Sequence, residues 1–235
     1  MRKAILFDLG NTLIKYYTRA EFSHILREAI EEVYNFLVQN LQFDISFDEI
    51  WQRVSKENYE SSDYKVRPLE ERLKHIFTAE KLSDDLIMNM CRCFMKPIFS
   101  RSEIYEDTLS VLAKLNSKGI KSVIISNTAW GSPSELWHEE IKRFGIDRYI
   151  DLIVFCRDVG WRKPDKRIFE FALKSLSLNV NECVFIGDDP RWDIAGPKAI
   201  GMEAILIDRE SQFGKPEEKR ITTLYEVLDM LVIEK

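Results

Sequence analysis

The sequence predicts an α/β fold in which a parallel sheet is interrupted near its start by a purely helical segment. From about Ile104 onward, apolar runs typical of buried strands alternate with helical patterns, as in a parallel sheet with right-handed crossovers. Residues 18–96 have helical periodicity and no convincing strand. We therefore expect an α/β core domain over residues 1–15 and 101–235, and a helical domain over residues 16–100.

Length and composition are those of a globular protein. The 235 residues fit one large domain or a core with an inserted second domain, and 45% apolar residues suffice for a full core. The formal charge is −5, with 34 basic and 39 acidic residues mixed along the chain. This mixture offers no basic stripe for a nucleic acid backbone, so an anionic substrate would have to be held locally.

No targeting, membrane or zinc-binding signal stands out. The N-terminus has a basic start but only a very short apolar run, which predicts neither a secretory signal nor a transmembrane helix. The cysteines form no C-x-x-C pair and lie far in sequence from the histidines. We expect a cytoplasmic protein, no membrane partner, and thiols buried in a reducing compartment, at Cys91, Cys93, Cys156 and Cys183.

The first strand is short and apolar and ends on a carboxylate. It runs from Lys3 to Phe7, and Asp8 is followed by the turn signal Gly10-Asn11, which favours a buried strand over a helix. In open α/β sheets ligands collect at the carboxyl ends of the strands. Asp8 is therefore a candidate for chemistry, although a strand that ends on Asp is often followed only by a turn.

The helical segment begins soon after this strand. Thr18 with Glu21, and Ser46 with Glu49, have the spacing of capping boxes. We expect helices from about residues 18, 46, 68 and 83, the first running to about residue 40, and the segment to end at Pro97.

The rest of the chain alternates between strands and helices. Apolar runs predict further strands over 121–126, 151–155, 182–186 and 204–207. Helical patterns predict helices over 108–116, 132–144, from 164 onward, 191–201 and 222–232.

Four of these apolar runs are followed by specific polar residues. In chain order the residues are Asp8; Ser126 with Asn127; Lys163, which stands before Pro164; and Asp188 with Asp189, with Asp193 beyond them. These stretches resemble, in the same order, the motifs of the haloacid dehalogenase superfamily of hydrolases. The resemblance extends from Lys3 to about Asp208, apart from a variable segment between the first two motifs.

The resemblance implies a doubly wound, Rossmann-like core with residues 16–100 as an all-helical cap. It also implies a Mg²⁺-dependent phosphatase that acts on a small phosphorylated metabolite. Asp8 would be the nucleophile that forms an aspartyl phosphate. Ser126 and the backbone amide of Asn127 would hold the phosphoryl oxygens, and Lys163 would neutralise their charge.

The same resemblance implies the metal ligands. Mg²⁺ would be bound by Asp8, the backbone carbonyl of Gly10 and Asp188, with Asp189 or Asp193 acting through water. Two carboxylates 4 Å apart repel by about 4 kcal/mol at an effective dielectric constant of 20, and a hard divalent cation relieves this repulsion. An alternative for Asp193 is that it merely caps the following helix.

One residue departs from the phosphatase pattern. Phosphatases of this superfamily have a second Asp two residues after the nucleophile, but this chain has Gly10 there. The side chain that normally acts as general acid and base, which contributes about 10² to 10⁴ in rate, is therefore missing. A substrate with a good leaving group, another proton donor, or weak catalysis would each explain Gly10.

Other functions stay open at this point. Haloacid dehalogenases lack the second Asp, but they need no metal, and the paired Asp188 and Asp189 would be costly in such a site. Phosphonoacetaldehyde hydrolase uses a cap lysine, for which Lys15, Lys56 and Lys65 are candidates. A weak relative that only binds phosphate or a protein is a further alternative.

Residues near the hinge or in an aromatic-rich stretch of the cap are expected to face the substrate, namely Tyr16, Tyr17, Tyr59, Tyr64 and Arg67. Trp161 and Trp192 lie beside two motifs and are further candidates. The alternative for all the aromatic residues is packing, which is their more frequent role in a helical domain.

Overall fold

The sheet has six strands, all paired in parallel. The computed structural model describes residues 2–59, 61–211 and 219–233, and within them the strand order is β5-β4-β1-β6-β7-β8. The predicted α/β fold with a parallel sheet is confirmed. The strands are β1 (Ala4–Phe7), β4 (Lys121–Ser126), β5 (Leu152–Phe155), β6 (Cys183–Gly187), β7 (Glu203–Ile207) and β8 (Arg220–Ile221).

The register brings the carboxyl ends of the three central strands together. Phe7 at the end of β1 pairs with Ile124 of β4 on one side and with Ile186 of β6 on the other. The next residue, Asp8, donates its backbone N–H to the Ile186 carbonyl at 2.8 Å. The polar residues that follow β1, β4 and β6 therefore meet at one edge of the sheet.

Helices cover both faces of the sheet, because successive side chains of a strand point to opposite faces. Ile5 and Phe7 belong to one buried cluster, and Ala4 and Leu6 to another. The first cluster takes side chains from α5 (Thr108–Ser117), α6 (Ser134–Arg143) and α10 (Tyr225–Ile233). The second takes them from α8 (Lys166–Leu176), with α7 (Cys156–Val159) and α9 (Ala195–Ala199) nearby.

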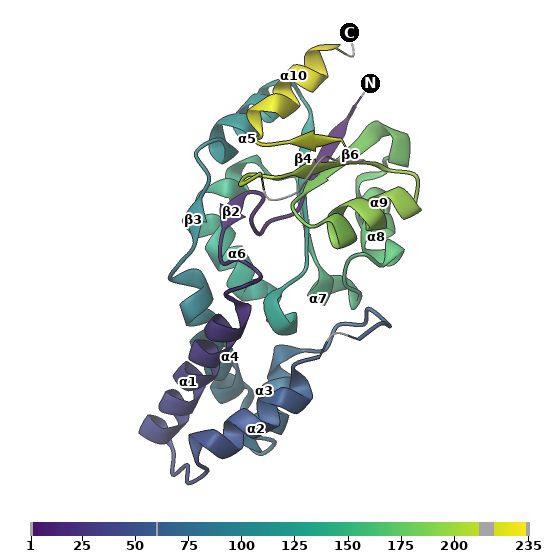
Figure 1. Cartoon of the computed structure of the whole chain (residues 1–235). Coiled ribbons are helices and arrows are strands. Elements are labelled where there is room, and N and C mark those ends of the chain that lie inside the picture. The colour runs from purple at the N-terminus through teal and green to yellow at the C-terminus, as the bar shows by residue number, and fades with distance from the viewer. Residues whose placement is uncertain (1, 60, 212–218, 234–235) are drawn as a thin grey trace.

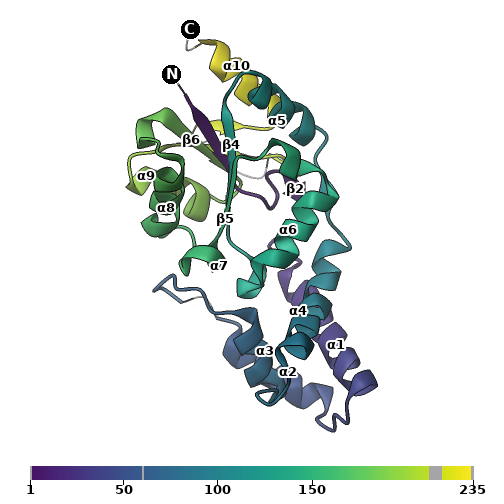
Figure 2. The same ribbon diagram turned by 180° about the vertical axis from the view of Figure 1, so that it is seen from behind.

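Four helices stand together away from the sheet. They are α1 (Phe22–Asn40), α2 (Phe47–Glu57), α3 (Leu69–Phe77) and α4 (Asp84–Phe99). Figures 1 and 2 show them grouped at one end of the molecule, on the side toward which β1 runs. The chain leaves and re-enters the core through an antiparallel two-stranded ribbon, β2 (Ile14–Lys15) with β3 (Glu103–Ile104).

Helix starts in this group follow the predicted capping residues in two cases. The Ser46 and Ser83 side chains accept hydrogen bonds from the first turns of α2 and α4. The first helix begins only at Phe22, although Thr18 does bond to the Glu21 carboxylate. These hydroxyl and carboxylate groups satisfy backbone N–H groups that have no partner inside the helix.

The prediction that this segment ends at Pro97 is wrong, because α4 continues to Phe99. Pro97 lies in the last turn, where only one helical N–H is lost. The Ser100 N–H still donates to the Lys96 carbonyl at 2.9 Å, and the Arg101 side chain donates from Nη1 to the Pro97 carbonyl at 2.9 Å.

Short elements were missed by the sequence patterns. The two-residue strands β2, β3 and β8 and the four-residue helix α7 are too short to show periodicity. The helix predicted over 191–201 is divided into a π-helical turn, η4 (Pro190–Ile194), and α9. No helix in the described part of the chain combines the length and apolarity that crossing a bilayer requires.

Candidate active site

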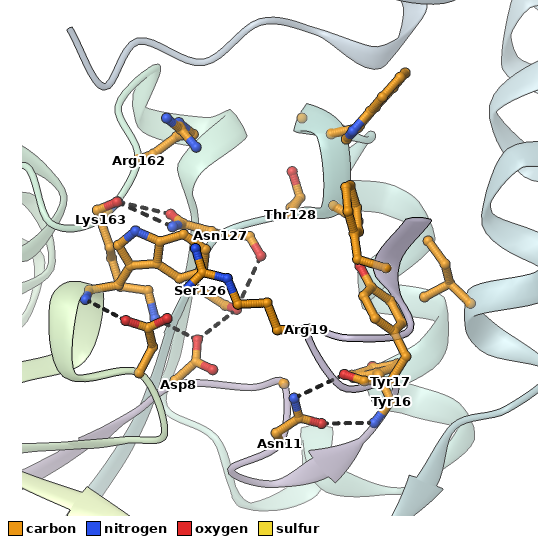
Figure 3. A pocket seen from close by; sticks show the side chains of 18 of the residues that line it. Asp8, Asn11, Tyr16, Tyr17, Arg19, Ser126, Asn127, Thr128, Arg162 and Lys163 are labelled. Atoms are coloured by element: carbon orange, nitrogen blue, oxygen red, sulfur yellow. Dashed lines mark hydrogen bonds and ion pairs between the residues drawn. The ribbon is translucent and has the colours of Figure 1, made fainter. Parts of the chain in front are cut away.

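A cavity of about 420 Å³ lies at the carboxyl ends of β1, β4 and β6. Its lining includes residues from all four motifs. Figure 3 shows three of these motifs converging from separate parts of the chain: Asp8, Ser126 with Asn127, and Lys163. The structure brings together all the residues singled out by the motifs, namely Asp8, Gly10, Ser126, Asn127, Lys163, Asp188, Asp189 and Asp193.

Asp8 is buried and held by two donors. Its side chain follows β1 directly and is 7% exposed. Its Oδ1 accepts a hydrogen bond from Ser126 Oγ at 2.9 Å and forms an ion pair with Lys163 Nζ at 2.5 Å. Both donors stabilise the anionic carboxylate, which is the form that can act as a nucleophile.

Lys163 bridges two carboxylates inside the protein. Its Nζ lies 2.5 Å from Asp8 Oδ1 and 2.6 Å from Asp193 Oδ1, and the side chain is 2% exposed. Burial alone would lower the pKa of Lys163, but the charges of Asp193 and Asp8 outweigh burial and the pKa is raised. Lys163 therefore stays charged at neutral pH.

Asn127 positions Lys163 through its side chain. Its Oδ1 accepts from the Lys163 backbone N–H at 2.8 Å, and its Nδ2 donates to the Lys163 carbonyl at 3.3 Å. Sequence reasoning gave Asn127 a role only through its backbone amide. The side-chain contact was missed because no pattern in the sequence says which segment lies beside β4.

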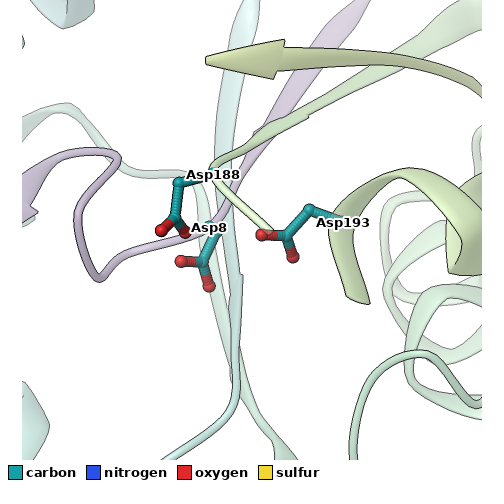
Figure 4. A group of neighbouring side chains, drawn as sticks. All are labelled: Asp8, Asp188 and Asp193. Atoms are coloured by element: carbon teal, nitrogen blue, oxygen red, sulfur yellow. The ribbon is translucent and has the colours of Figure 1, made fainter. Parts of the chain in front are cut away.

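Three carboxylates lie close together, as Figure 4 shows. Asp8, Asp188 and Asp193 each offer an oxygen, and these oxygens all lie within 4.8 Å of one another. Burial raises the pKa of Asp188, and repulsion from Asp8 and Asp193 raises it further. The donor set is all oxygen and strongly anionic, so it fits a hard divalent cation.

Asp189 and Asp193 make different contacts at the start of η4. The Asp189 side chain accepts from the N–H groups of Arg191 and Trp192, so Asp189, and not Asp193, is the capping residue. Asp193 is instead buried and accepts from Lys163 and from the Asp189 N–H. A Cβ at Gly187 would lie 2.4 Å from the Asp193 Cγ, so only glycine there leaves room for this carboxylate.

The aromatic ring of Tyr16 packs over Gly10. A Cβ at Gly10 would lie 3.6 Å from Tyr16 Cδ2, an ordinary van der Waals contact. Asn11, in the left-handed conformation (φ 51°), holds the next turn: its Oδ1 accepts from Tyr16 N–H and its Nδ2 donates to the Tyr17 carbonyl. The Gly-Asn turn was visible in the sequence, but this role of Asn11 was not.

Most of the residues expected to face the substrate line the cavity. Tyr16, Tyr17, Tyr59, Arg67 and Trp192 do so, and Tyr64 and Trp161 do not. The three candidate cap lysines also lie outside its lining. Lining residues to which sequence reasoning gave no role include Arg19, Arg72, Thr128, Trp130 and Arg162. Thr128 and Arg162 stand next to motif residues, whereas Arg19 and Arg72 lie in segments that carry no recognisable motif.

Comparisons with known proteins identify relatives and folds. A family model for haloacid dehalogenase-like hydrolases matches residues 2–201. The glyceraldehyde 3-phosphate phosphatase of Methanothermobacter thermautotrophicus is 29% identical over 210 residues, which is 89% of this chain and 87% of that protein.

Two solved structures share the fold. One is a HAD phosphatase from Thermococcus onnurineus, with a TM-score of 0.69, 24% identity and coverage of 97% of each chain. The other is a 2-haloacid dehalogenase from Pseudomonas syringae pv. Tomato DC3000, with a TM-score of 0.74, 21% identity and complete coverage of both chains.

Proposed function

The chain belongs to the haloacid dehalogenase-like hydrolases, and we propose that within this family it is a Mg²⁺-dependent phosphatase acting on a small phosphorylated metabolite. One observation carries the proposal: the buried Asp8 carboxylate contacts Ser126 and Lys163 and lies within the carboxylate cluster. The similarity to a sugar-phosphate phosphatase over most of the chain supports the same reaction.

In the proposed reaction Asp8 attacks the phosphorus atom of the substrate. A bond forms between an Asp8 oxygen and phosphorus while the bond from phosphorus to the leaving oxygen breaks, which gives a phosphorylated Asp8. Water then attacks this phosphoryl group, releases inorganic phosphate and restores the Asp8 carboxylate. The two steps together balance as hydrolysis of a phosphate monoester.

The neighbouring residues of this chain would stabilise the transferring group. The Ser126 hydroxyl and the Asn127 backbone amide would donate to phosphoryl oxygens, and Lys163 would offset their negative charge. Asp8, the Gly10 carbonyl and Asp188 would hold the metal, with Asp193 or Asp189 assisting through water. When bound, Mg²⁺ would supply positive charge at the phosphoryl oxygens and relieve repulsion among the carboxylates.

Gly10 sets a limit on this reaction. It has no side chain to protonate the leaving oxygen or to activate water, a contribution of about 10² to 10⁴ in rate where present. We propose that the enzyme favours leaving groups that need little protonation, such as aryl, acyl or anomeric sugar oxygens.

Residues 16–100 would form the cap that covers the site. The loop between α2 and α3 lies against the segment that precedes Lys163: Val66 N–H donates to the Gly160 carbonyl at 3.0 Å, and Arg162 N–H donates to the Tyr64 carbonyl at 2.8 Å. A cover of this kind excludes bulk water from the phosphorylated intermediate and selects the substrate. The remaining residues, 1–15 and 101–235, would form the catalytic domain.

The other reactions of the family fit the site less well. A metal-free dehalogenase would have to keep the repelling carboxylates of Asp8, Asp188 and Asp193 in one buried cluster without a cation. A phosphonate hydrolase of the lysine type would need a cap lysine in the cavity, and none of Lys15, Lys56 and Lys65 lines it.

The test is hydrolysis of aryl, acyl, alkyl and sugar phosphates by the purified protein, with Mg²⁺ and with EDTA. We expect turnover that requires the metal and is fastest on the better leaving groups. Asp8→Asn should reduce this turnover by at least about 10³-fold without unfolding the protein, because the amide is a far weaker nucleophile than the carboxylate.

Two results would argue against the phosphatase. Turnover retained in Asp8→Asn would remove the covalent mechanism. An absence of turnover on every ester, with Mg²⁺ and phosphate still bound, would favour a catalytically inactive binding relative.

A further inference from the structure

The cavity is lined by more arginines than transfer of one phosphoryl group requires. Arg19, Arg67, Arg72 and Arg162 line it together with Lys163. Figure 3 shows Arg19 reaching across the cavity toward Ser126, and Arg162 on the segment of Lys163. In the proposed reaction Lys163 and the metal held by the carboxylate cluster offset the charge of the phosphoryl group, which leaves Arg72 and Arg162 without a role.

Arg72 is a partly buried cation with an unused donor. Its guanidinium donates to the Glu57 carbonyl at 2.6 Å and lies 5.1 Å from the Trp130 ring centre and 5.8 Å from that of Tyr59. Its Nε is buried and has no hydrogen-bond partner within the described residues. A buried donor left unpaired costs about 1–3 kcal/mol, and an anion bound to the same guanidinium from the cavity would offset that cost.

Arg72 lies within the electrostatic range of other cations. Burial lowers the pKa of Arg72, and the charges of Arg162 and Arg67 contribute in the same direction, against Glu57. Proteins rarely gather half-buried cations without an anion to offset them. Arg67 has such an anion, because it forms an ion pair with Asp63 at 3.2 Å.

Arg162 has a polar contact but no carboxylate partner. Its guanidinium donates to the Ser61 carbonyl at 3.3 Å. Neither Arg72 nor Arg162 forms an ion pair with Asp or Glu in the part of the chain that the structure describes. A positive subsite in which neither arginine contacts a carboxylate therefore faces the same cavity as Asp8.

We propose that the substrate carries a second anionic group, a carboxylate or a second phosphate, which Arg72 and Arg162 bind while the first phosphoryl group meets Asp8. This inference rests on the proposed phosphatase function and narrows its substrate class. Arginine suits the task because its planar fork of donors matches both carboxylate and phosphate oxygens. The aromatic rings of Trp130 and Tyr59 pack near the Arg72 guanidinium and hold it in place.

The test compares three esters of similar length as competitive inhibitors of 4-nitrophenyl phosphate hydrolysis in Mg²⁺. They are glycerol 3-phosphate, which has an uncharged tail, 3-phosphoglycerate, which adds a carboxylate, and propane-1,3-diol bisphosphate, which adds a phosphate. We expect one or both esters with a charged tail to bind about 10- to 100-fold more tightly than glycerol 3-phosphate, the range expected for charge-assisted hydrogen bonds. The two charged probes distinguish carboxylate from phosphate.

Variants locate the effect. Arg72→Gln should bring the affinity ratio of charged to uncharged ester close to one, and Arg162→Gln is the second variant in case Arg72→Gln does not fold. Arg53→Gln is the matched control, because Arg53 also donates to a backbone carbonyl, that of Ile76, but lies outside the cavity lining. It should leave the ratio unchanged.

The outcomes separate this inference from the proposed function. Hydrolysis of 4-nitrophenyl phosphate with equal affinity for all three esters would overturn the second-anion subsite and leave the phosphatase standing. If neither 4-nitrophenyl phosphate nor any other ester of the panel is hydrolysed, the proposed function fails, and calorimetric titration of the three esters still measures the ratio. A ratio that persists in both Arg72→Gln and Arg162→Gln would also overturn the assignment.

Discussion

Gly10 is the residue at which chemistry and structure can be compared most directly. Gly10 lacks the carboxylate expected there for a phosphatase. A Cβ at this position would lie 3.6 Å from Tyr16 Cδ2, which is an ordinary van der Waals contact. Gly10 is also outside the left-handed region of backbone conformation. A side chain can therefore be introduced with only a local adjustment of Tyr16.

Gly10→Asp should accelerate hydrolysis of alkyl phosphates more than that of aryl phosphates. The new carboxyl group would protonate the poorer leaving oxygen, so we expect a gain of at least about tenfold on alkyl esters, part of the 10² to 10⁴ that general acid catalysis supplies. Steady-state kcat for a matched alkyl and aryl pair measures it. Equal effects on the two esters would count against the leaving-group argument, and Gly10→Asn is the uncharged control.

The carboxylate cluster gives a prediction for stability. Because the pKa of Asp188 is raised in the folded protein, its ionisation is more costly there than in the unfolded chain, so stability is lost as pH rises above the ordinary Asp value of about 3.9. In EDTA at pH 7, Asp188→Asn should therefore raise Tm by about 2–4 °C, the shift given by 1 kcal/mol in a chain of this size. Near pH 4 the difference should vanish.

Metal addition is the second half of the same experiment. Mg²⁺ should raise the Tm of the wild-type protein, because it binds the folded cluster, and should have little effect on Asp188→Asn. The exposed Asp229 on α10 lies outside the cavity, so Asp229→Asn serves as control. An equal rise in all three proteins would place the metal elsewhere.

At the scale of the elements, the loop between α2 and α3 closes onto the core at Gly131. Gly131 has φ +69°, and a Cβ there would lie 2.2 Å from the Arg67 carbonyl oxygen, a contact that the backbone has to relieve. This loop carries Arg67 and precedes Arg72, so its seat on the core positions one wall of the cavity.

Gly131→Ala should raise KM by roughly 3- to 10-fold, because the added methyl group pushes the loop away from the core. Gly119→Ala is a matched control: Gly119 has φ +70°, but a Cβ there meets nothing within 4 Å. Both variants should lose about 1–2 kcal/mol of stability from the left-handed backbone, measured by thermal unfolding. A similar KM in the two variants would show that the loop does not shape the substrate site.

Prediction from sequence succeeded for elements that have a clear local sequence pattern. The strands ending at Phe7, Ser126 and Phe155 are continuous apolar runs, and their bounds came within a residue of those observed. The strand β8 could not be found, because two residues have no pattern and its pairing with β7 is decided by tertiary structure. The end of α4 was misplaced because Pro97 falls in a last turn, where its missing N–H matters little.

Some features of the candidate site follow from the sequence pattern, and others depend on tertiary contacts. Asp8 and Asp188 directly follow β1 and β6, and Ser126 is the last residue of β4, so sheet topology alone places them together. The side-chain clamp of Asn127 on Lys163 and the capping role of Asp189 depend on which loops come into contact, which the sequence does not state. Arg72 and Arg162 were missed for that reason, since they lie 90 residues apart in sequence and only the fold brings both to the lining of one cavity.

For the whole molecule, the parallel sheet is what brings distant residues to one point. Asp8 and Lys163 are 155 residues apart in sequence, yet their side chains form an ion pair at 2.5 Å. Because β1 lies between β4 and β6, its end faces residues from both halves of the core, as in other open α/β sheets. The helices α1–α4 stand at the end of the molecule toward which β1 runs, as Figure 1 shows.

The measurement that tests the account most directly is a search for a phosphoryl group on Asp8 during turnover. The protein is mixed with an aryl phosphate and Mg²⁺, quenched in acid within the first turnovers, and digested for mass spectrometry. We expect one phosphoryl group on the peptide that contains Asp8, and none in Asp8→Asn. Release of inorganic phosphate at the wild-type rate, with no phosphorylated Asp8 at any time and with activity kept in Asp8→Asn, would contradict the account.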